Sequence, residues 1–246
     1  MDRALVSSIA HRWHPIAAPV SPSNARTLLR RLGCPPDGDV VDLGCGQGEW
    51  LLALLDEQPG VRGTGVDISE PALAEAQTNA GCRGSGGRVT WVHADAATWS
   101  GGGYDAVICV GASHVFGGLT ATLAALRAHL RPGGRVLFGD AIWETPPSPV
   151  AQRALEAGPD DYPDLAGFLE RVADHDYEVG YGHISTLEEW DDYEWSWTGS
   201  LTEWALAENT TQADRLYALE VARSHRSGWL AGYRGQLGFA TVVLRT

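Results

Sequence analysis

The sequence predicts an α/β fold built on a doubly wound, mostly parallel β-sheet. Between residues 39 and 140, five short apolar stretches alternate with longer amphipathic ones, which is the rhythm of repeated βαβ units. The chain has 246 residues, of which 44% are hydrophobic and 20% charged, so it can bury a core and does not read as disordered. Right-handed crossovers would place helices on both faces and a ligand at the carboxyl ends of the strands.

Local signals define each element in order. Ser21 and Pro22 predict a helix start and Gly33 a helix end, because serine caps, proline fits the first turn and glycine terminates. Ser69 predicts a second cap before the helix at 70–80. Further helices are expected at 49–58 and 118–130. The five strands are expected at 39–43, 61–67, 88–95, 104–112 and 134–140.

The pattern changes after residue 140. Residues 141–163 are rich in proline and predict a loop or lid. A helix at 164–176 then leads to two strand-like stretches, 177–186 and 237–246, the second rich in β-branched residues. The fifty residues between them, 187–236, are helical in pattern and hold five of the ten tryptophans. We expect a helical cap inserted into the sheet domain, because a loop of that length needs its own structure.

The charge distribution disfavours nucleic acid as a partner. Formal net charge is −13, the 18 basic residues are all arginine, and no basic stripe is visible that could follow a phosphate backbone. Thirteen acids and a single base lie between Glu156 and Glu194. Such a run is either a solvated face or an acidic rim around a site for a neutral or cationic substrate.

Cysteine spacing and hydropathy exclude several further classes. Cys34, Cys45, Cys82 and Cys109 form no C-x-x-C pair, which argues against a zinc site and a disulfide scaffold. No apolar run approaches the ~20 residues of a membrane span, and the first residues are too polar for a signal peptide. We therefore expect a cytoplasmic protein with no membrane partner and no metal.

The glycine turn after the first strand carries the main chemical signal. Gly44, Gly46 and Gly48 form G-x-G-x-G, with Glu49 where a dinucleotide site needs its third glycine. Asp42 precedes the turn, where a carboxylate repels a pyrophosphate and suits an ammonium group. Asp67 ends the second strand, about where a carboxylate accepts both hydroxyls of a ribose.

The stretches VVDLGCGQGEW, GVDIS, HADA and LRPGGRVL together resemble the strand-end motifs of class I S-adenosylmethionine-dependent methyltransferases. The resemblance covers about residues 35–140 and extends to the last two strands. It implies a seven-stranded Rossmann-like sheet whose last strand is antiparallel. It also implies an N-terminal helical lid at 1–34 and a cofactor-binding domain at 35–186 and 237–246, beside which the inserted, tryptophan-rich helical segment 187–236 is expected to be a substrate cap.

The resemblance also implies roles for individual residues toward S-adenosylmethionine. Asp42 and the turn would hold the methionine moiety, Asp67 the ribose, and Ile68 would pack on the adenine. Asp67 read alone is an ordinary strand-end acid, and Asp95 a helix cap. The full set of implied cofactor-binding residues is Asp42, Gly44, Cys45, Gly46, Asp67, Ile68, Asp95, Ala96 and Val110.

The methyl acceptor is expected to be a small molecule of secondary metabolism with an N, O or S nucleophile. The chain lacks the Asn/Asp-Pro-Pro-aromatic sequence and the Pro-Cys pair that mark nucleic-acid base methyltransferases. His114, just past the fourth strand, is the candidate general base, because imidazole titrates near neutrality; a structural or substrate-positioning histidine is the alternative, and Asp140 and Glu144 are alternative bases. Candidate substrate-binding residues are His14, Asp140, Trp143 and Trp197.

Two other functions fit the same sequence. A protein could bind S-adenosylmethionine without catalysis, for structure or regulation. A nicotinamide-dependent oxidoreductase has a similar sheet, but Asp42 and the missing third glycine argue against it.

Overall fold

The computed structural model describes residue 1 and residues 3–246, and of residues 3 and 4 the backbone alone. Residue 2, part of the expected N-terminal lid, lies outside the described residues. The chain divides into two compact units. Unit 1 comprises Met1–Val20, Ala141–Ala166 and Ser185–Phe239, and unit 2 comprises Ser21–Asp140, Gly167–Ile184 and Ala240–Thr246. The functional division into lid, cofactor domain and cap stays a prediction.

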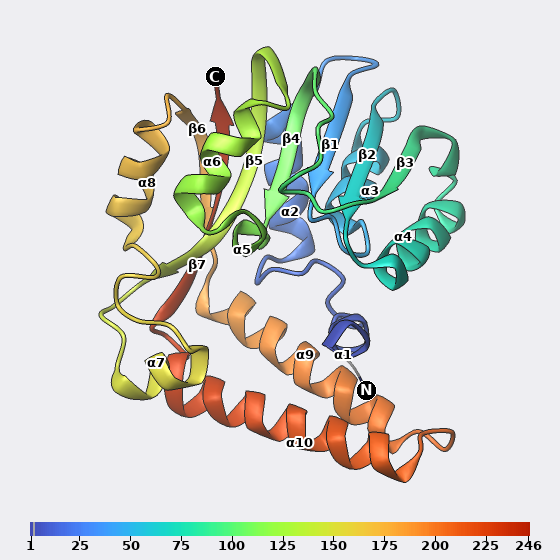
Figure 1. Cartoon of the computed structure of the whole chain (residues 1–246), viewed down its shortest axis with the longest axis vertical. Helices are drawn as coiled ribbons and strands as arrows, with labels where there is room; N and C mark the ends of the chain where they lie inside the picture. The colour runs from blue at the N-terminus through green and yellow to red at the C-terminus, as the bar shows by residue number, and fades with distance from the viewer. Residues whose placement is uncertain (2) are drawn as a thin grey trace. The chain divides into compact units, whose positions relative to one another are not determined.

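A seven-stranded sheet of order β3-β2-β1-β4-β5-β7-β6 forms the centre of unit 2 (Figure 1). The β1–β2, β1–β4, β2–β3 and β4–β5 pairs are parallel, and the β6–β7 pair is antiparallel. The predicted fold class is therefore confirmed. The strands are β1 (Asp39–Leu43), β2 (Arg62–Asp67), β3 (Val89–His93), β4 (Tyr104–Val110), β5 (Leu130–Trp143), β6 (Glu178–Ile184) and β7 (Leu237–Arg245).

Strand order reverses between β1 and β4, and the carboxyl ends on either side of such a reversal form the usual ligand crevice of open α/β sheets. In Figure 1, α2 and α3 lie behind the sheet and α6 in front of it. The predicted caps are present, since the side chain of Ser21 accepts from Asn24 N and that of Ser69 from Ala72 N. The helices here are α2 (Pro22–Leu32), α3 (Glu49–Glu57), α4 (Glu70–Cys82), α5 (Ser113–Phe116), α6 (Leu119–Arg127) and α8 (Leu165–Ala173), with a short 3-10 turn, η1 (Gly86–Arg88).

The core of unit 2 is aliphatic around β1 and α3 and aromatic near α8. The rings of Phe138 and Phe168 stack with centroids 5.8 Å apart. Burying each large side chain of this core contributes about 1.5–3 kcal/mol. Its fully buried leucines fix the sheet ends that carry the functional residues; they are Leu28, Leu29, Leu32, Leu43, Leu51, Leu52, Leu54 and Leu55.

Unit 1 is helical. Its helices are α1 (Arg3–Ala10), α7 (Pro149–Leu155), α9 (Leu187–Leu206) and α10 (Gln212–Gly228), followed by a π-helical turn, η2 (Trp229–Tyr233). Thr186 and Glu189 form a capping box at the start of α9. One buried cluster joins Val6 and Ile9 of α1 to Leu201 of α9. A second cluster contains Trp143, Ala151, Ala157, Trp229, Tyr233 and Leu237.

Two sequence expectations need correction. The stretch 141–163 is not only a loop, because α7 lies inside it, capped by Ser148 with Pro149 in its first turn. The fifth strand does not end at residue 140 but continues to Trp143. Asp140 and Trp143 therefore lie within β5 and not beyond it, and both side chains are buried.

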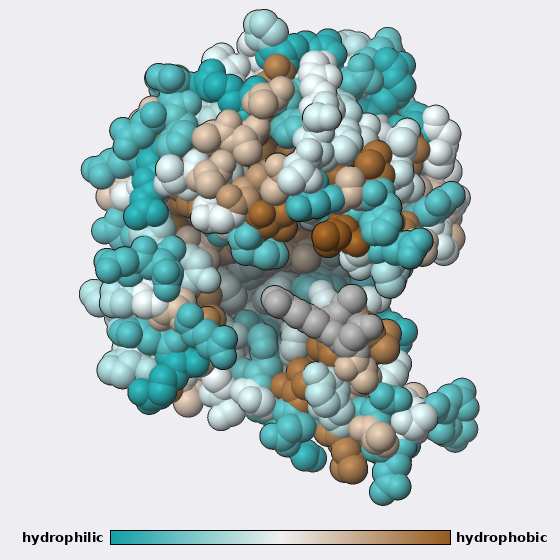
Figure 2. Space-filling view, viewed as in Figure 1, coloured by the Kyte–Doolittle hydropathy of each residue, from teal (hydrophilic) through white to brown (hydrophobic). Residues whose placement is uncertain are grey.

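Exposed apolar side chains are dispersed on the face of the molecule drawn in Figure 2. Figure 2 shows brown, apolar residues in small separate groups on a face that is otherwise hydrophilic. Ile68, Leu206 and Leu216 are among the exposed ones. Of the helices in the described part of the chain, none combines the length and apolar character needed to cross a membrane.

Candidate active site

The glycine turn connects β1 to α3 and leaves an open surface above Gly46. Gly44 and Cys45 both donate their N–H groups to the carbonyl of Val66, at 2.9 and 3.1 Å, which ties the turn to β2. Gly44 and Gly46 have φ of 75° and 52°, values that favour glycine. A Cβ at Gly46 would meet no atom within 4 Å, whereas one at Gly44 would lie 2.6 Å from the Cβ of Ala112.

Two carboxylates lie beside this turn. Asp42 is 3% exposed, and its Oδ2 has no hydrogen-bond partner among the described residues. Burial raises the pKa of Asp42 to about 8, and the nearby charge of Asp67 adds to the rise. Asp67 accepts the N–H of Gly46 on Oδ2 at 2.7 Å and that of Ser69 on Oδ1 at 2.8 Å. A cation placed beside Asp42 would favour its ionised form, so this edge of the sheet suits a cationic ligand.

The ends of β2 and β3 form the next part of the site. Ile68 is 69% exposed, so its side chain is available to a ligand. His93 at the end of β3 donates from Nε2 to the carbonyl of Ile68 at 3.0 Å, which ties the two strand ends together. Asp95 is exposed, and its Oδ1 accepts the N–H of Ala97 at 2.9 Å. Ala96, the next residue, is buried.

The segment that follows β4 carries the candidate base. His114 is exposed in the short helix α5. Gly111 precedes this helix and Gly117 follows it, both at positive φ. Val110 and Cys45 are buried, and burial raises the pKa of the Cys45 thiol, so that side chain is an inert part of the turn. Eleven of the expected site residues thus belong to unit 2. Ten of them lie at or just after the carboxyl ends of strands, and Asp140 lies within β5. The ten are Asp42, Gly44, Cys45, Gly46, Asp67, Ile68, Asp95, Ala96, Val110 and His114.

The other expected substrate residues belong to unit 1. His14 is buried, contacts the carbonyl of Ile16 through Nδ1 at 2.7 Å, and meets the ring of Tyr193 edge-on. Trp143 packs edge-on against Tyr162 and keeps its buried Nε1 without a partner among the described residues. Trp197 stacks on a histidine, His225, with ring centroids 4.0 Å apart. Their binding roles stay predictions.

Sequence reasoning missed a polar group in unit 1. Glu194, which is 2% exposed, accepts hydrogen bonds from His225 Nε2 and from the hydroxyl of Tyr233, each at 2.7 Å. In the sequence, Glu194 is only the last acid of the acidic run that begins at Glu156. Its spacing from Thr198 and Leu201 on α9 is the signal that could have identified it, because all three occupy the buried face.

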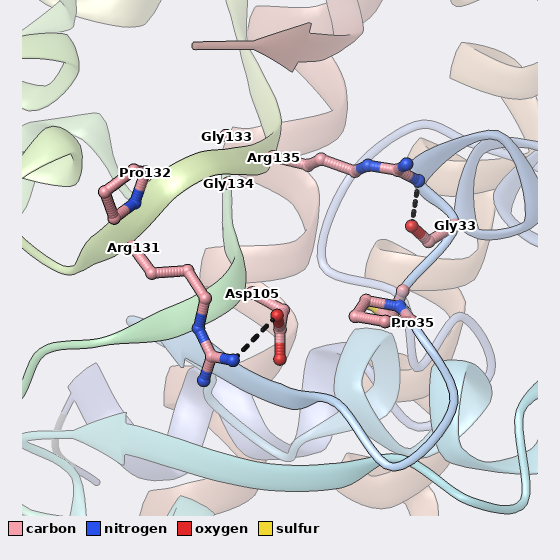
Figure 3. Close-up of a pocket in the computed structure, with 9 residues that line it drawn as sticks. Gly33, Pro35, Asp105, Arg131, Pro132, Gly133, Gly134 and Arg135 are labelled. Atoms are coloured by element: carbon pink, nitrogen blue, oxygen red, sulfur yellow. Dashed lines mark hydrogen bonds and ion pairs between the residues drawn. The ribbon is translucent and has the colours of Figure 1, made fainter.

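Figure 3 shows a different cavity, of about 280 Å³, at the amino ends of β4 and β5. Arg131 pairs there with Asp105 at 3.0 Å, and Arg135 donates to the carbonyl of Gly33. Its charged groups are thus used to hold α2 and the strand ends. In the described residues there is also no group of three or more metal-ligating side chains placed to hold an ion.

Comparison with known proteins identifies the family. A model of the methyltransferase domain matches residues 41–136. The YjhP protein of Escherichia coli (strain K12) is 32% identical over 202 residues, 79% of each chain. The crystal structure of an S-adenosylmethionine-dependent methyltransferase from Geobacter sulfurreducens in complex with S-adenosyl-L-homocysteine is similar, with a TM-score of 0.89 at 28% identity over 98% of this chain and 97% of that one. A ubiquinone biosynthesis O-methyltransferase from Aromatoleum aromaticum is 32% identical over 140 residues, 54% of this chain and 58% of its own.

The chain belongs to the class I S-adenosylmethionine-dependent methyltransferases. It is an enzyme of that class, and its cofactor is S-adenosylmethionine. The residues present fit this cofactor. The unpartnered Oδ2 of Asp42 suits the ammonium group of its methionine moiety, and the open surface of Gly46 leaves room for close approach.

Replacing Asp42 by asparagine should stabilise the free protein above neutral pH and weaken cofactor binding. The folded state raises the pKa of Asp42 to about 8, against about 3.9 in an unfolded chain. The folded protein thus holds a proton that the unfolded one lacks between these values, and stability falls as pH rises from about 4 to about 8. Asparagine removes this loss, so at pH 8 we expect a Tm about 2–8 °C higher.

Thermal unfolding at pH 6 and pH 8, with and without S-adenosylhomocysteine, measures both effects. Affinity should fall about tenfold, because an amide cannot neutralise the ammonium group. The difference in Tm between variant and parent should be smaller at pH 6. A variant that is less stable than the parent at pH 8, or one that binds S-adenosylhomocysteine as tightly as the parent does, would show that Asp42 is a structural carboxyl group.

Proposed function

We propose that this methyltransferase acts on a small-molecule acceptor through an N, O or S nucleophile, in a pathway of secondary metabolism. The absence of lysine and of a basic stripe supports a small molecule over nucleic acid. The relative from Aromatoleum aromaticum is named for O-methylation in ubiquinone biosynthesis, which is small-molecule chemistry.

One observation carries the proposal. The loop after β4 lies against the glycine turn. A Cβ atom added to Gly44 would be only 2.6 Å from the Cβ atom of Ala112, which belongs to this loop. His114 follows two residues later and is exposed. An exposed imidazole in this segment is available to remove a proton from an acceptor.

The chain's own residues then have three tasks. Asp42 binds the ammonium group of the methionine moiety, the turn at Gly46 leaves space for that moiety to approach, and Asp67 accepts the ribose hydroxyls on the lone pairs left free by Gly46 and Ser69. His114 removes a proton from the acceptor. S-adenosylmethionine, when bound, supplies a methyl group on a sulfonium centre already activated for displacement. Asp140, buried in β5, and Glu144, exposed just after it, are the alternative bases.

The test is turnover against a panel. Purified protein would be incubated with S-adenosylmethionine and matched phenols, alcohols, thiols and amines of similar size, with a DNA duplex as the nucleic-acid control. Formation of S-adenosylhomocysteine above the rate without acceptor is the expected result for at least one small-molecule class. Methylation of the duplex, with every small molecule inactive, would contradict the proposal.

A further inference from the structure

The cavity in Figure 3 lies within unit 2, because all the residues that line it belong to that unit. It sits at the amino ends of β4 and β5, whereas the glycine turn follows the carboxyl end of β1. Its volume of about 280 Å³ is below that of drug-sized ligand pockets and suits a small molecule. Two arginines and one aspartate line it, among glycines, prolines and a cysteine.

The first arginine, Arg131, is neutralised by its neighbours. Its Nη1 lies 3.0 Å from Oδ1 of Asp105, and its Nε and Nη2 both donate to the carbonyl of Gly103, at 2.9 and 2.6 Å. Burial raises the pKa of the Cys34 thiol to about 12, and the nearby charge of Asp105 adds to the rise. The thiol therefore stays neutral, and the charges of Arg131 and Asp105 offset each other.

The second arginine, Arg135, uses only part of its guanidinium group. Its Nη1 donates to the carbonyl of Leu32 at 2.8 Å and to that of Gly33. A glycine is needed there, because a Cβ at Gly33 would lie 2.8 Å from this Nη1. Nε and Nη2 donate to no described residue, and no described carboxylate pairs with the group. Arg135 thus holds the end of α2 through one nitrogen and keeps two nitrogens for another partner.

Those two nitrogens form a fork that matches the spacing of two oxygens in a carboxylate or phosphate. Unit 1 contains the same arrangement with its acceptor, since Nε and Nη2 of Arg234 bind the carboxylate of Asp191 at 2.8 and 2.7 Å. The fork of Arg135 offers the same pair of donors at the wall of the cavity.

The neighbouring charges also favour an anion. Arg245 donates to the carbonyls of Leu32 and Arg31, each at 3.2 Å, so Arg135 and Arg245 share the carbonyl of Leu32. Burial lowers the pKa of Arg245, and the nearby charge of Arg135 lowers it further. An anion beside two like charges reduces their repulsion. Positive charge is thus concentrated at the end of α2, in a chain of formal net charge −13.

We propose that this cavity binds a small organic anion, whose carboxylate or phosphate group accepts hydrogen bonds from Nε and Nη2 of Arg135. Capping of α2 does not explain these two donors, because it uses Nη1 alone. The site is a second ligand site of unit 2, separate from the glycine turn, and it does not depend on the nature of the methyl acceptor.

Three probes test the ligand class on the full chain at constant ionic strength: acetate, acetamide and inorganic phosphate. Acetate and acetamide have the same shape and differ in charge. The NMR signal of the Arg135 Nε–H group, identified by its loss in Arg135→Lys, should shift at millimolar acetate or phosphate and at least fivefold less with acetamide. Tighter binding of acetate would support a carboxylate ligand, and tighter binding of phosphate a phosphate ester. An equal shift with acetamide, or no shift with either anion, would overturn the inference.

Two variants that keep the positive charge then locate the binding. Arg135→Lys loses the fork and should bind the anions at least fivefold more weakly. Arg245→Lys is the matched control, because Arg245 contacts the same carbonyl of Leu32 and does not line the cavity. It should bind like the parent. The rise in Tm with added anion, compared with the same variant without anion, measures the affinity, because a ligand of the folded state stabilises it by mass action. Equal rises in the two variants would show that Arg135 only caps α2.

Discussion

Replacing His114 by alanine should lower kcat by about 10²–10⁴-fold, the range for loss of a general base. The affinity for S-adenosylhomocysteine should change less than about twofold, because His114 lies beyond the glycine turn in α5 and not on it. Stability should stay within about 0.5 kcal/mol, since the side chain is exposed. Initial rates at saturating acceptor across pH 5–9 measure the effect.

The pH profile separates a base from a positioning residue. In the parent enzyme kcat should fall with decreasing pH along one ionisation, and His114→Ala should lose that limb. His175→Ala is the matched control and should keep it. If kcat of the His114 variant lies within threefold of the parent value and its pH profile is unchanged, His114 is not the general base. Asp140 and Glu144 are then the remaining candidates. That result also follows if the acceptor is a thiolate or a neutral amine, for which proximity suffices.

The sheet and its cofactor edge could be predicted because their signals are local. Ser21-Pro22 and Ser69 mark helix starts within a few residues, and both caps form as expected. The glycines of the turn and the acid at the end of β2 are likewise fixed by sequence spacing. Each of these inferences needs only neighbouring residues, so a single sequence carries them.

Two expectations after residue 140 are wrong: the absence of a helix within 141–163 and the end of the fifth strand at residue 140. Ser148-Pro149 is the same helix start as Ser21-Pro22, yet the surrounding prolines favoured a loop, and α7 was missed. The fifth strand is expected to end at Asp140. In the structure Asp140 is 8% exposed within β5, and Ile142 and Trp143 continue the strand.

The Glu194–His225 pair could not be predicted from composition, since its members are 31 residues apart and on different helices. An acidic run indicates a solvated surface, and most of its members are exposed. Only the helical period distinguishes Glu194, which shares the buried face of α9 with Thr198, Leu201 and Ala205. Its partners on α10 and η2 required the tertiary fold.

Replacing Gly46 by alanine should weaken S-adenosylhomocysteine binding by about 10–100-fold, or about 1.4–2.8 kcal/mol. A Cβ at Gly46 would meet no protein atom within 4 Å, so the added methyl group fills only the open surface of the turn. The cost to folding is the strain of φ at 52°, about 1 kcal/mol. The ligand, which needs close approach to this backbone, loses far more.

Gly84 provides a control matched in conformation and surroundings. It has φ of 69°, and a Cβ there would also meet nothing within 4 Å. It follows α4 and lies outside the glycine turn. Gly84→Ala should therefore lose as much stability as Gly46→Ala, about 2–4 °C in Tm, without the loss of affinity.

Calorimetric titration of S-adenosylhomocysteine into the parent, Gly46→Ala and Gly84→Ala proteins tests the cofactor site most directly. We expect the parent and Gly84→Ala to bind with the same Kd and Gly46→Ala to bind at least tenfold more weakly. Equal Kd values for the two variants would contradict the placement of the cofactor on the glycine turn.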